Sequence, residues 1–302
     1  FKGKADIYLD ANENPFGNLN RYPDPYQREL KLVISKIKGV PENNIFLGNG
    51  SDEIIDLCFR LFCIPGTDKA LTFHPSYGMY EVSASVNDVQ IIKILLTDNF
   101  NISINDVMPW LSDDMLKLIL ICSPNNPTGN CMDRAVVERI ISSFNGIILI
   151  DEAYIDFADQ PSMKDCICKY PNLIVMQTFS KAFGMASVRV GMAFTNPDIV
   201  LYFNKIKPPY NISTPNQKSV LNKLNKIEEY KTQVIKIIKE RERLSRELAK
   251  LPLVLEVYPS DANFILVRVT DAGSIYNYLV KKGIIIRNRS SVINNCVRIT
   301  VG

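Results

Sequence analysis

The sequence predicts an α/β fold: a large domain with a mostly parallel sheet sandwiched by helices, plus a smaller α+β domain. Through the middle of the chain, short β-branched runs alternate with helical patterns, and each run is followed by polar residues. Such runs are typical of parallel strands buried on both faces. With 302 residues, of which 46% are hydrophobic and 22% charged, the chain can build a large core.

The elements of the large domain follow in chain order. Strands are expected at Ile45–Leu47, Lys69–Phe73, Leu116–Cys122, Ile147–Ile150 and Leu173–Gln177. Helical patterns follow at Asp52–Phe62 and Asp133–Phe144. Helices would therefore cover both faces of the sheet.

The C-terminal part predicts a linker and a smaller unit. Gln217–Leu251 has the pattern of one long charged amphipathic helix, which Pro252 ends. The elements expected after it are a strand at Asn263–Val269, a helix at Ala272–Lys282, and strands at Ile284–Arg287 and Val297–Val301. We therefore predict a large domain over 26–215, with an N-terminal arm over 1–25 and the linker helix and small domain over 216–302.

The arm itself is rich in Asn, Pro and Gly (DANENPFGNLNRYPDPYQ), which predicts an extended loop lying across another surface. The chain starts at Phe1 and stops after a strand-like run, so we expect it to be trimmed at both ends.

Composition argues against several classes of protein. A net charge of +3 without a Lys/Arg-rich block gives no reason to expect a nucleic-acid partner, and no apolar run approaches the ~18 residues of a membrane span. The seven cysteines are odd in number and mostly lie in apolar segments, which favours reduced thiols and a cytoplasmic protein. Cys166-Ile-Cys168 lacks the usual metal-ligand spacing and His74 is the only histidine, so no metal site is expected.

Polar clusters follow four of the expected strands, where ligands bind in open parallel sheets. They are GNGSDE (48–53), SPNNPTG (123–129), DEAY (151–154) and TFSK (178–181). A single cluster would be weak support for a site, whereas four at one edge of a sheet predict one.

Each cluster also has a plainer explanation. In GNGSDE, Gly50, Ser51 and Asp52 could cradle a phosphate at a helix N-terminus, or form an ordinary capped turn. Asp151 could pair with a protonated ring nitrogen, or serve as a turn aspartate. Tyr154 could donate its phenolic proton to a ligand, or be a half-buried aromatic.

The same ambiguity holds for two further positions. Asn126, in a turn fixed by the following proline, could aim its amide into the cleft or simply form the turn. Tyr77 could lie flat against an aromatic ligand, with Tyr80 as the nearby alternative, and core packing would suit either ring.

Lys181 read alone suggests solvated surface charge, but its setting favours another role. It follows an apolar strand and sits between Phe179 and Phe183, and desolvation lowers a lysine pKa and makes the amine nucleophilic. An amine beside an anion cradle and a strand-end aspartate is what a pyridoxal-phosphate enzyme requires.

SPNNPTG, DEAY and TFSKAFGMASVRVG, in this order, resemble the fold-type I pyridoxal-phosphate aminotransferases. The more detailed resemblance is to the histidinol-phosphate aminotransferase family. It rests on DANENP, NLNRYPDP, GNGSDE, HPSYGMY, DEAYIDF, SDANFILVR and GIIIRNRSS…CVRITVG, and covers essentially the whole chain.

The resemblance implies roles for individual residues. Lys181 matches the lysine that forms the Schiff base with pyridoxal 5′-phosphate, Asp151 the partner of its ring nitrogen, and Tyr77 the stacked ring. Asn126 and Tyr154 match the partners of its phenolic oxygen. The phosphate cup would comprise Gly50, Ser51, Asp52, Thr178, Ser180 and Arg189. Arg298, Arg287, Asn126 and Tyr22 would contact the substrate, with Tyr22 reaching over from the partner subunit of a homodimer.

The implied reaction moves an amino group between L-glutamate and imidazole acetol phosphate, giving L-histidinol phosphate and 2-oxoglutarate in histidine biosynthesis. Alternatives of the same fold are an aromatic-amino-acid aminotransferase and a threonine-phosphate decarboxylase. A cofactor-binding regulator without turnover is a further alternative, although no DNA-binding segment or basic patch is visible in this sequence. The stretch between Asn14 and Asn18 and the stretch Ser291–Cys296 are a few residues shorter than in the family, which leaves the loop assignments there open.

Overall fold

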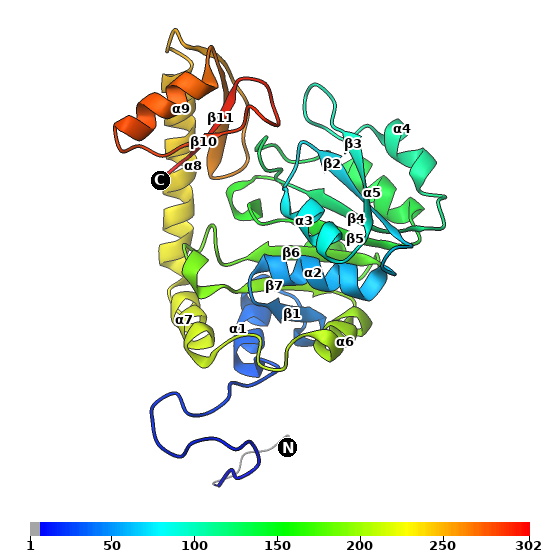
Figure 1. The fold of residues 1–302 in the computed structure, drawn as a ribbon. Helices are drawn as coiled ribbons and strands as arrows, with labels where there is room; N and C mark the ends of the chain where they lie inside the picture. Colours follow the sequence, from blue (N-terminus) through cyan, green and yellow to red (C-terminus); the bar gives the residue numbers. More distant parts are fainter. Residues whose placement is uncertain (1–6) are drawn as a thin grey trace.

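A computed structural model describes residues 7–302 of the chain, and two sheets organise them (Figure 1). The larger sheet has seven strands in the order β1-β7-β6-β5-β4-β2-β3. They are β1 (Ile45–Gly48), β2 (Lys69–His74), β3 (Gln90–Leu95), β4 (Leu116–Cys122), β5 (Ile147–Asp151), β6 (Leu173–Thr178) and β7 (Gly191–Thr195). This arrangement confirms the predicted α/β class.

Only one of these strands runs against the others. β7 is antiparallel to both β1 and β6, whereas the pairs β6·β5, β5·β4, β4·β2 and β2·β3 are parallel. Since β1 and β6 both oppose β7, β1 runs in the same direction as the parallel strands. The carboxyl ends of six strands therefore lie at one edge, where the polar clusters were expected to meet.

Helices cover the two faces of the large sheet. The α-helices of the described residues are α1 (Arg28–Lys38), α2 (Ser51–Phe62), α3 (Met79–Val86), α4 (Ile104–Val107), α5 (Arg134–Ser143), α6 (Pro197–Ile206), α7 (Thr214–Leu224), α8 (Ile227–Leu248) and α9 (Ala272–Lys281). Alternate residues of β4 enter different cores. Leu118 and Leu120 pack with α2, α3 and α6, and Ile119 and Ile121 pack with α1, α5, α7 and the start of α8. Burial on both faces explains the continuous apolar runs in the sequence.

The smaller sheet is antiparallel and has the order β10-β11-β9-β8. Its strands are β8 (Val254–Val257), β9 (Phe264–Val269), β10 (Arg287–Asn288) and β11 (Cys296–Thr300). One face, with Ile265, Val267 and Val297, packs against α9 and the end of α8. The start of α8 packs against the large sheet, so this helix joins the two parts (Figure 1).

Two predicted elements differ from the structure. Gln217–Leu251 is not one helix, because α7 ends at Leu224 and α8 begins at Ile227. The break lets Leu224 and Tyr230 both enter the core of the large sheet, and no glycine or proline marks it in the sequence. The strand expected at Ile284–Arg287 is also wrong, because only Arg287 and Asn288 pair with β11 and Ile285 is exposed.

The described part of the N-terminal arm extends away from the rest of the chain (Figure 1). Ile7, Leu9, Phe16 and Leu19 are each at least 75% exposed, although they are apolar. Tyr22 stacks on Tyr210 with ring centres 4.4 Å apart. The arm thus lacks a core of its own, and the domain boundaries predicted at 25/26 and 215/216 stay a prediction.

Candidate active site

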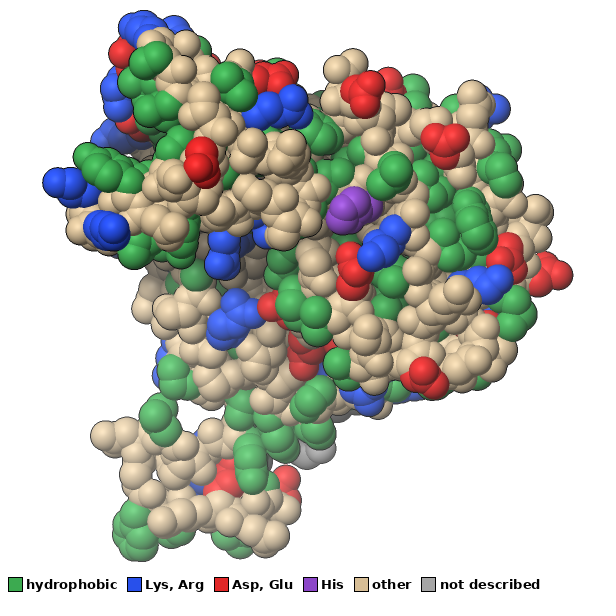
Figure 2. Space-filling model, turned by 45° about the horizontal axis from the view of Figure 1, so that its top comes forward, with side chains coloured by type: hydrophobic (Ala, Val, Ile, Leu, Met, Phe, Trp, Pro, Cys, Tyr) green, Lys and Arg blue, Asp and Glu red, His purple; other side chains and the backbone are tan. Residues whose placement is uncertain are grey.

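A cavity of about 490 Å³ opens between the carboxyl edge of the large sheet and the small sheet. Figure 2 shows Lys and Arg side chains gathered in the hollow between these two parts. Predicted site residues that line it are Ser51, Asp52, Tyr77, Asn126, Asp151, Tyr154, Thr178, Ser180, Lys181, Arg189, Arg287 and Arg298. A larger hollow lies under the N-terminal arm, but among its lining residues only Tyr22 belongs to the predicted set.

Asp151, the last residue of β5, is 3% exposed. Its Oδ2 accepts a hydrogen bond from the Tyr80 hydroxyl at 2.9 Å, and its Oδ1 accepts one from the Ala153 N–H at 3.0 Å. Burial raises the pKa of Asp151 to about 6, while these two hydrogen bonds and the charge of Lys181 oppose the rise. The carboxylate therefore stays ionised at neutral pH in a buried position.

The two tyrosines of HPSYGMY have different places. Tyr80 is fully buried and bound to Asp151, so it does not line the cavity and cannot stack on a ligand there. Tyr77 lines the cavity, donates to Asp52 Oδ1 at 3.2 Å, and meets the Tyr80 ring edge-on. Of the two alternatives, the geometry favours Tyr77 as the stacking ring.

Lys181 follows β6 and turns its side chain into the cavity, where the amine lies 5.5 Å from the centre of the Tyr154 ring. The side chain is open to the cavity, but its surroundings still remove much of the water around the amine. This desolvation lowers the pKa of Lys181, and the nearby charge of Arg298 lowers it further. The amine is thus easier to deprotonate than an ordinary surface lysine.

The turn before α2 forms a cradle at one end of the cavity. Gly50 occupies the N-cap position with φ 78°, so no side chain caps the helix, and its first residues, Ser51 and Asp52, line the cavity. A Cβ at Gly50 would collide with the guanidinium of Arg189, whose Nη2 pairs with Asp52 Oδ2 at 3.1 Å. Nearby, the Ser180 N–H donates to Thr178 Oγ1 at 3.1 Å.

The small sheet contributes the opposite side. Arg298 Nη1 donates to Asn126 Oδ1 at 2.5 Å, and its guanidinium lies 5.1 Å from the centre of the Phe264 ring. Asn126 Nδ2 in turn lies 3.5 Å from the Tyr154 hydroxyl. These contacts connect Arg298 of the small sheet to Asn126 and Tyr154, which follow strands of the large sheet.

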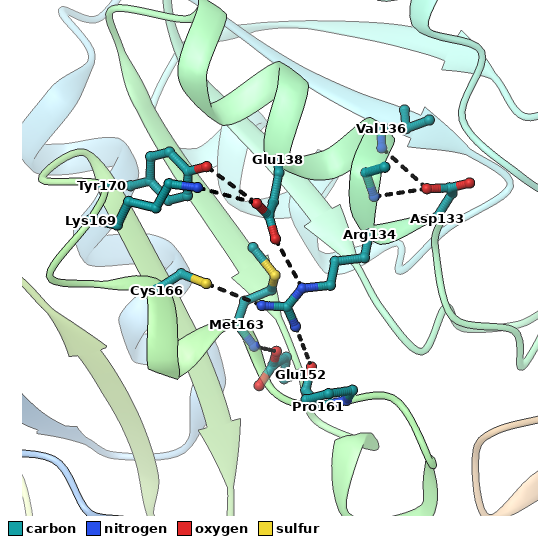
Figure 3. A network of polar contacts seen from close by, with 11 residues as sticks. Asp133, Arg134, Val136, Glu138, Glu152, Pro161, Met163, Cys166, Lys169 and Tyr170 are labelled. Atoms are coloured by element: carbon teal, nitrogen blue, oxygen red, sulfur yellow. Dashed lines mark hydrogen bonds and ion pairs between the residues drawn. The ribbon is translucent and has the colours of Figure 1, made fainter.

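Glu152 holds the segment DEAY in place. Its carboxylate accepts hydrogen bonds from the Met163 N–H at 2.6 Å and from Gln177 Nε2 at 2.9 Å. Figure 3 shows Glu152 beside a second network, in which Arg134 binds Glu138, the Pro161 carbonyl and the Cys166 sulfur. Together these contacts hold the loop after β5, and with it Asp151 and Tyr154.

Gly50 and Tyr22 are the predicted residues that do not line the cavity. Gly50 lies against the Arg189 guanidinium, whereas Tyr22 is 57% exposed and lies with the arm. Arg289, by contrast, lines the cavity although the sequence interpretation did not select it. Its spacing of two residues from Arg287 in a strand-like stretch was the available signal, because such residues share a face.

Comparison with known proteins identifies the family. The family model described as "Aminotransferase class I and II" matches residues 5–302. The chain belongs to this family.

Relatives of this aminotransferase are similar to it in sequence over nearly its whole length. A histidinol-phosphate aminotransferase of Bacteroides fragilis is 52% identical over 302 residues, which cover 99% of this chain and 87% of that protein. One of Cytophaga hutchinsonii is 50% identical over 309 residues, covering 100% of this chain and 88% of the relative. The crystal structure of a histidinol-phosphate aminotransferase from Clostridium acetobutylicum superposes with a TM-score of 0.86 at 29% identity, covering 94% and 86% of the two chains.

As a class I and II aminotransferase, the protein depends on pyridoxal 5′-phosphate. Its cavity fits this group, because a buried carboxylate, an amine of lowered pKa, and the start of α2 with Arg189 all line one space. The fit explains why Gly50 has no side chain, since even a methyl group would occupy the place of the Arg189 guanidinium.

No helix within residues 7–302 is long and apolar enough to cross a membrane.

Proposed function

We propose that this aminotransferase transfers an amino group between L-glutamate and imidazole acetol phosphate, giving L-histidinol phosphate and 2-oxoglutarate, and so acts in histidine biosynthesis. The carrying observation is that Lys181, Asp151 and Arg298 line one cavity. The carboxylate ends β5 and the amine follows β6 of the large sheet, and the arginine lies in β11 of the small sheet. The relatives named for this activity, at about half identity over the whole chain, support it over the aromatic-amino-acid and decarboxylase alternatives.

In this proposal Lys181 would hold the cofactor covalently, and its amine would remove the proton from the substrate α-carbon. The lowered pKa of Lys181 supports the second role, because a general base must be free of its proton near neutral pH. When bound, the cofactor supplies a ring system that accepts the electron pair left on that carbon. Asp151 would accept the N–H of the ring nitrogen and so keep it protonated.

The remaining residues bind and orient. Tyr77 would lie against the ring, and Asn126 and Tyr154 would bind its phenolic oxygen. The residues that would hold the phosphate are those of the cradle and its neighbours, Gly50, Ser51, Asp52, Thr178, Ser180 and Arg189. Arg298 and Arg287 receive the anionic group of the substrate, for which guanidinium forks are suited.

The central test is Lys181→Ala. We expect turnover to disappear, and we expect borohydride reduction of the variant with cofactor to leave its mass unchanged, because Lys181 is the only lysine of residues 7–302 that lines the cavity. Lys205→Ala, at an exposed lysine over the Tyr202 ring, is the matched control and should behave as wild type. Normal turnover of L-histidinol phosphate by Lys181→Ala would reject the assignment, whereas a wild type that instead releases carbon dioxide from threonine phosphate would reject the reaction.

We further propose that the protein is a cytoplasmic homodimer in which the arm reaches the partner's cavity with Tyr22. The support is that the apolar side chains of the arm lie exposed and that Tyr22 lies outside the cavity of its own chain. A second copy would remove this apolar surface from water.

A further inference from the structure

The small-sheet side of the cavity carries a third arginine, Arg289. Arg287 pairs with Arg298 across β10 and β11, and the Arg289 N–H continues the ladder to the Cys296 carbonyl at 2.8 Å. Alternate residues of a strand share a face, and directly paired residues share one too. Arg287, Arg289 and Arg298 therefore point to the same side of the sheet, and all three line the cavity.

Within residues 7–302, none of these three guanidinium groups forms an ion pair with an Asp or Glu side chain. The ion pairs of the described residues are all made by other basic side chains. The Nε atoms of Arg289 and Arg298 are both buried there without a hydrogen-bond partner. Burial lowers the pKa of Arg289, and the charges of Arg298 and Arg287 lower it further. Like charges placed side by side in a sheet are destabilising, so this corner requires a compensating anion.

Arg298 and Arg289 are engaged differently. Arg298 already donates to Asn126 and lies over the Phe264 ring, which fixes it beside Tyr154 near the centre of the cavity. The side chain of Arg289 makes no hydrogen bond to any described residue. Its donors remain available for a ligand that extends past Arg298.

The two substrates of the proposed reaction differ in how far their anionic group lies from the amine-bearing carbon. The α-carboxylate of glutamate is attached directly to the amine-bearing carbon. The phosphoryl group of histidinol phosphate is attached through a methylene and an ester oxygen, so it reaches farther from that carbon. It also carries a charge of about −1.5 to −2 at neutral pH and three acceptor oxygens, where a carboxylate carries one charge and two oxygens. A second guanidinium fork matches the extra charge and the extra oxygen.

We propose that Arg289 is a specificity-determining residue for the phosphate monoester of the substrate. It binds the phosphoryl oxygens beside Arg298 and stays unused when the glutamate carboxylate occupies the site. This inference rests on the proposed function. It implies that the half-reaction with histidinol phosphate requires Arg289, whereas the half-reaction with glutamate does not.

The test compares the holoenzyme with Arg289→Gln and Arg289→Lys. For Arg289→Gln we expect the KM for L-histidinol phosphate and the inhibition constant of inorganic phosphate to rise about tenfold or more, with the KM for glutamate changed by less than about twofold. Arg289→Lys keeps the charge but loses the fork, so it should lie between the two. Arg268→Gln is the control, since Arg268 is another arginine of the small sheet that lies outside the cavity lining.

The outcomes are separable. The inference would be overturned if, in Arg289→Gln, the KM for histidinol phosphate and the inhibition constant of phosphate both stayed within about twofold of wild type. It would also be overturned if the glutamate KM rose as much as the histidinol-phosphate KM. A wild type without turnover of histidinol phosphate would defeat the proposed function instead, and phosphate inhibition of the glutamate half-reaction would still test Arg289. If Arg289→Gln does not fold, Arg289→Lys decides by the same two constants.

Discussion

Asp151 shows how a single residue keeps a charge in a place that disfavours it. Burial raises the pKa of this carboxyl to about 6, and the Tyr80 hydroxyl is the largest influence that opposes the rise. Tyr80 is itself fully buried, so its phenol depends on this bond as much as the carboxylate does. The pair therefore positions the group that would meet the cofactor's ring nitrogen.

Removing this hydrogen bond in Tyr80→Phe should weaken cofactor binding, and more so at lower pH. The bond lowers the Asp151 pKa, so its loss raises that pKa further, and the carboxylate becomes protonated at a higher pH than in wild type. Hydrogen bonds to charged groups contribute about 1.5–3 kcal/mol, so we expect the cofactor dissociation constant to rise about tenfold at slightly acidic pH.

Cofactor titrations of both proteins at a slightly acidic and a slightly basic pH check this. The ratio of variant to wild-type dissociation constants should be greater on the acidic side. A ratio that does not change with pH would show that Tyr80 only fills space.

At the scale of elements, the loop after β5 depends on one buried carboxylate. Glu152 is 2% exposed, and burial raises its pKa, while the bonds from Ser162, Met163 and Gln177 oppose the rise. It ties the loop to β6, because Gln177 lies in that strand.

Glu152→Ala should lower the free energy of unfolding by about 2–4 kcal/mol, because it leaves several buried donors without an acceptor. Glu138→Ala is the comparison in the neighbouring network of Figure 3, where the ion pair with Arg134 is nearly a third exposed on each side. Such a pair contributes about 1 kcal/mol or less. Urea unfolding of the two variants measures both values, and equal losses would contradict the difference in burial.

The elements differ in how far the sequence predicts them. β4, β5 and β6 are predictable because burial on both faces leaves continuous apolar runs. The reversed β7 and the short β10 are not, since pairing partners are set by distant segments and leave no local pattern. The break between α7 and α8 has no local signal either, because tertiary packing, and not a helix-breaking residue, determines its position.

The same distinction applies within the site. Lys181, Asp151 and Asn126 follow strands, so the rule of carboxyl ends finds them. Tyr80 was weighed as a stacking ring, because only the folded chain shows that its hydroxyl points at Asp151. Arg289 requires the register of β10 against β11 to be known.

At the scale of the whole molecule, two sheets must keep one arrangement for the cavity to exist. Asp261 connects them, since its N–H donates to the Gly129 carbonyl at 2.7 Å and its Oδ2 accepts from the Cys131 N–H at 2.9 Å. A Cβ at Gly129 would come within 2.6 Å of Ser260 Oγ. These contacts hold the loop of Asn126 against the small sheet that carries Arg298.

The proposed dimer can be tested by complementation between Tyr22→Ala and Lys181→Ala. Each variant alone should have little activity, because every site lacks one group. In an equal mixture after joint refolding, half of the dimers should be mixed and should carry one intact site, giving about one quarter of wild-type activity. Activity of the mixture no higher than that of the separate variants would argue against shared sites, and full activity of Tyr22→Ala alone would remove that residue from the site.

The three arginines of the small sheet have a thermodynamic consequence for the protein as a whole. Their mutual repulsion weakens the folded state, and unfolding relieves it by separating the charges. An anion that binds among them stabilises only the folded chain, by an amount that grows with its concentration. The melting temperature of the holoenzyme should therefore rise with phosphate at constant ionic strength, so that the fold is most stable when its substrate is abundant.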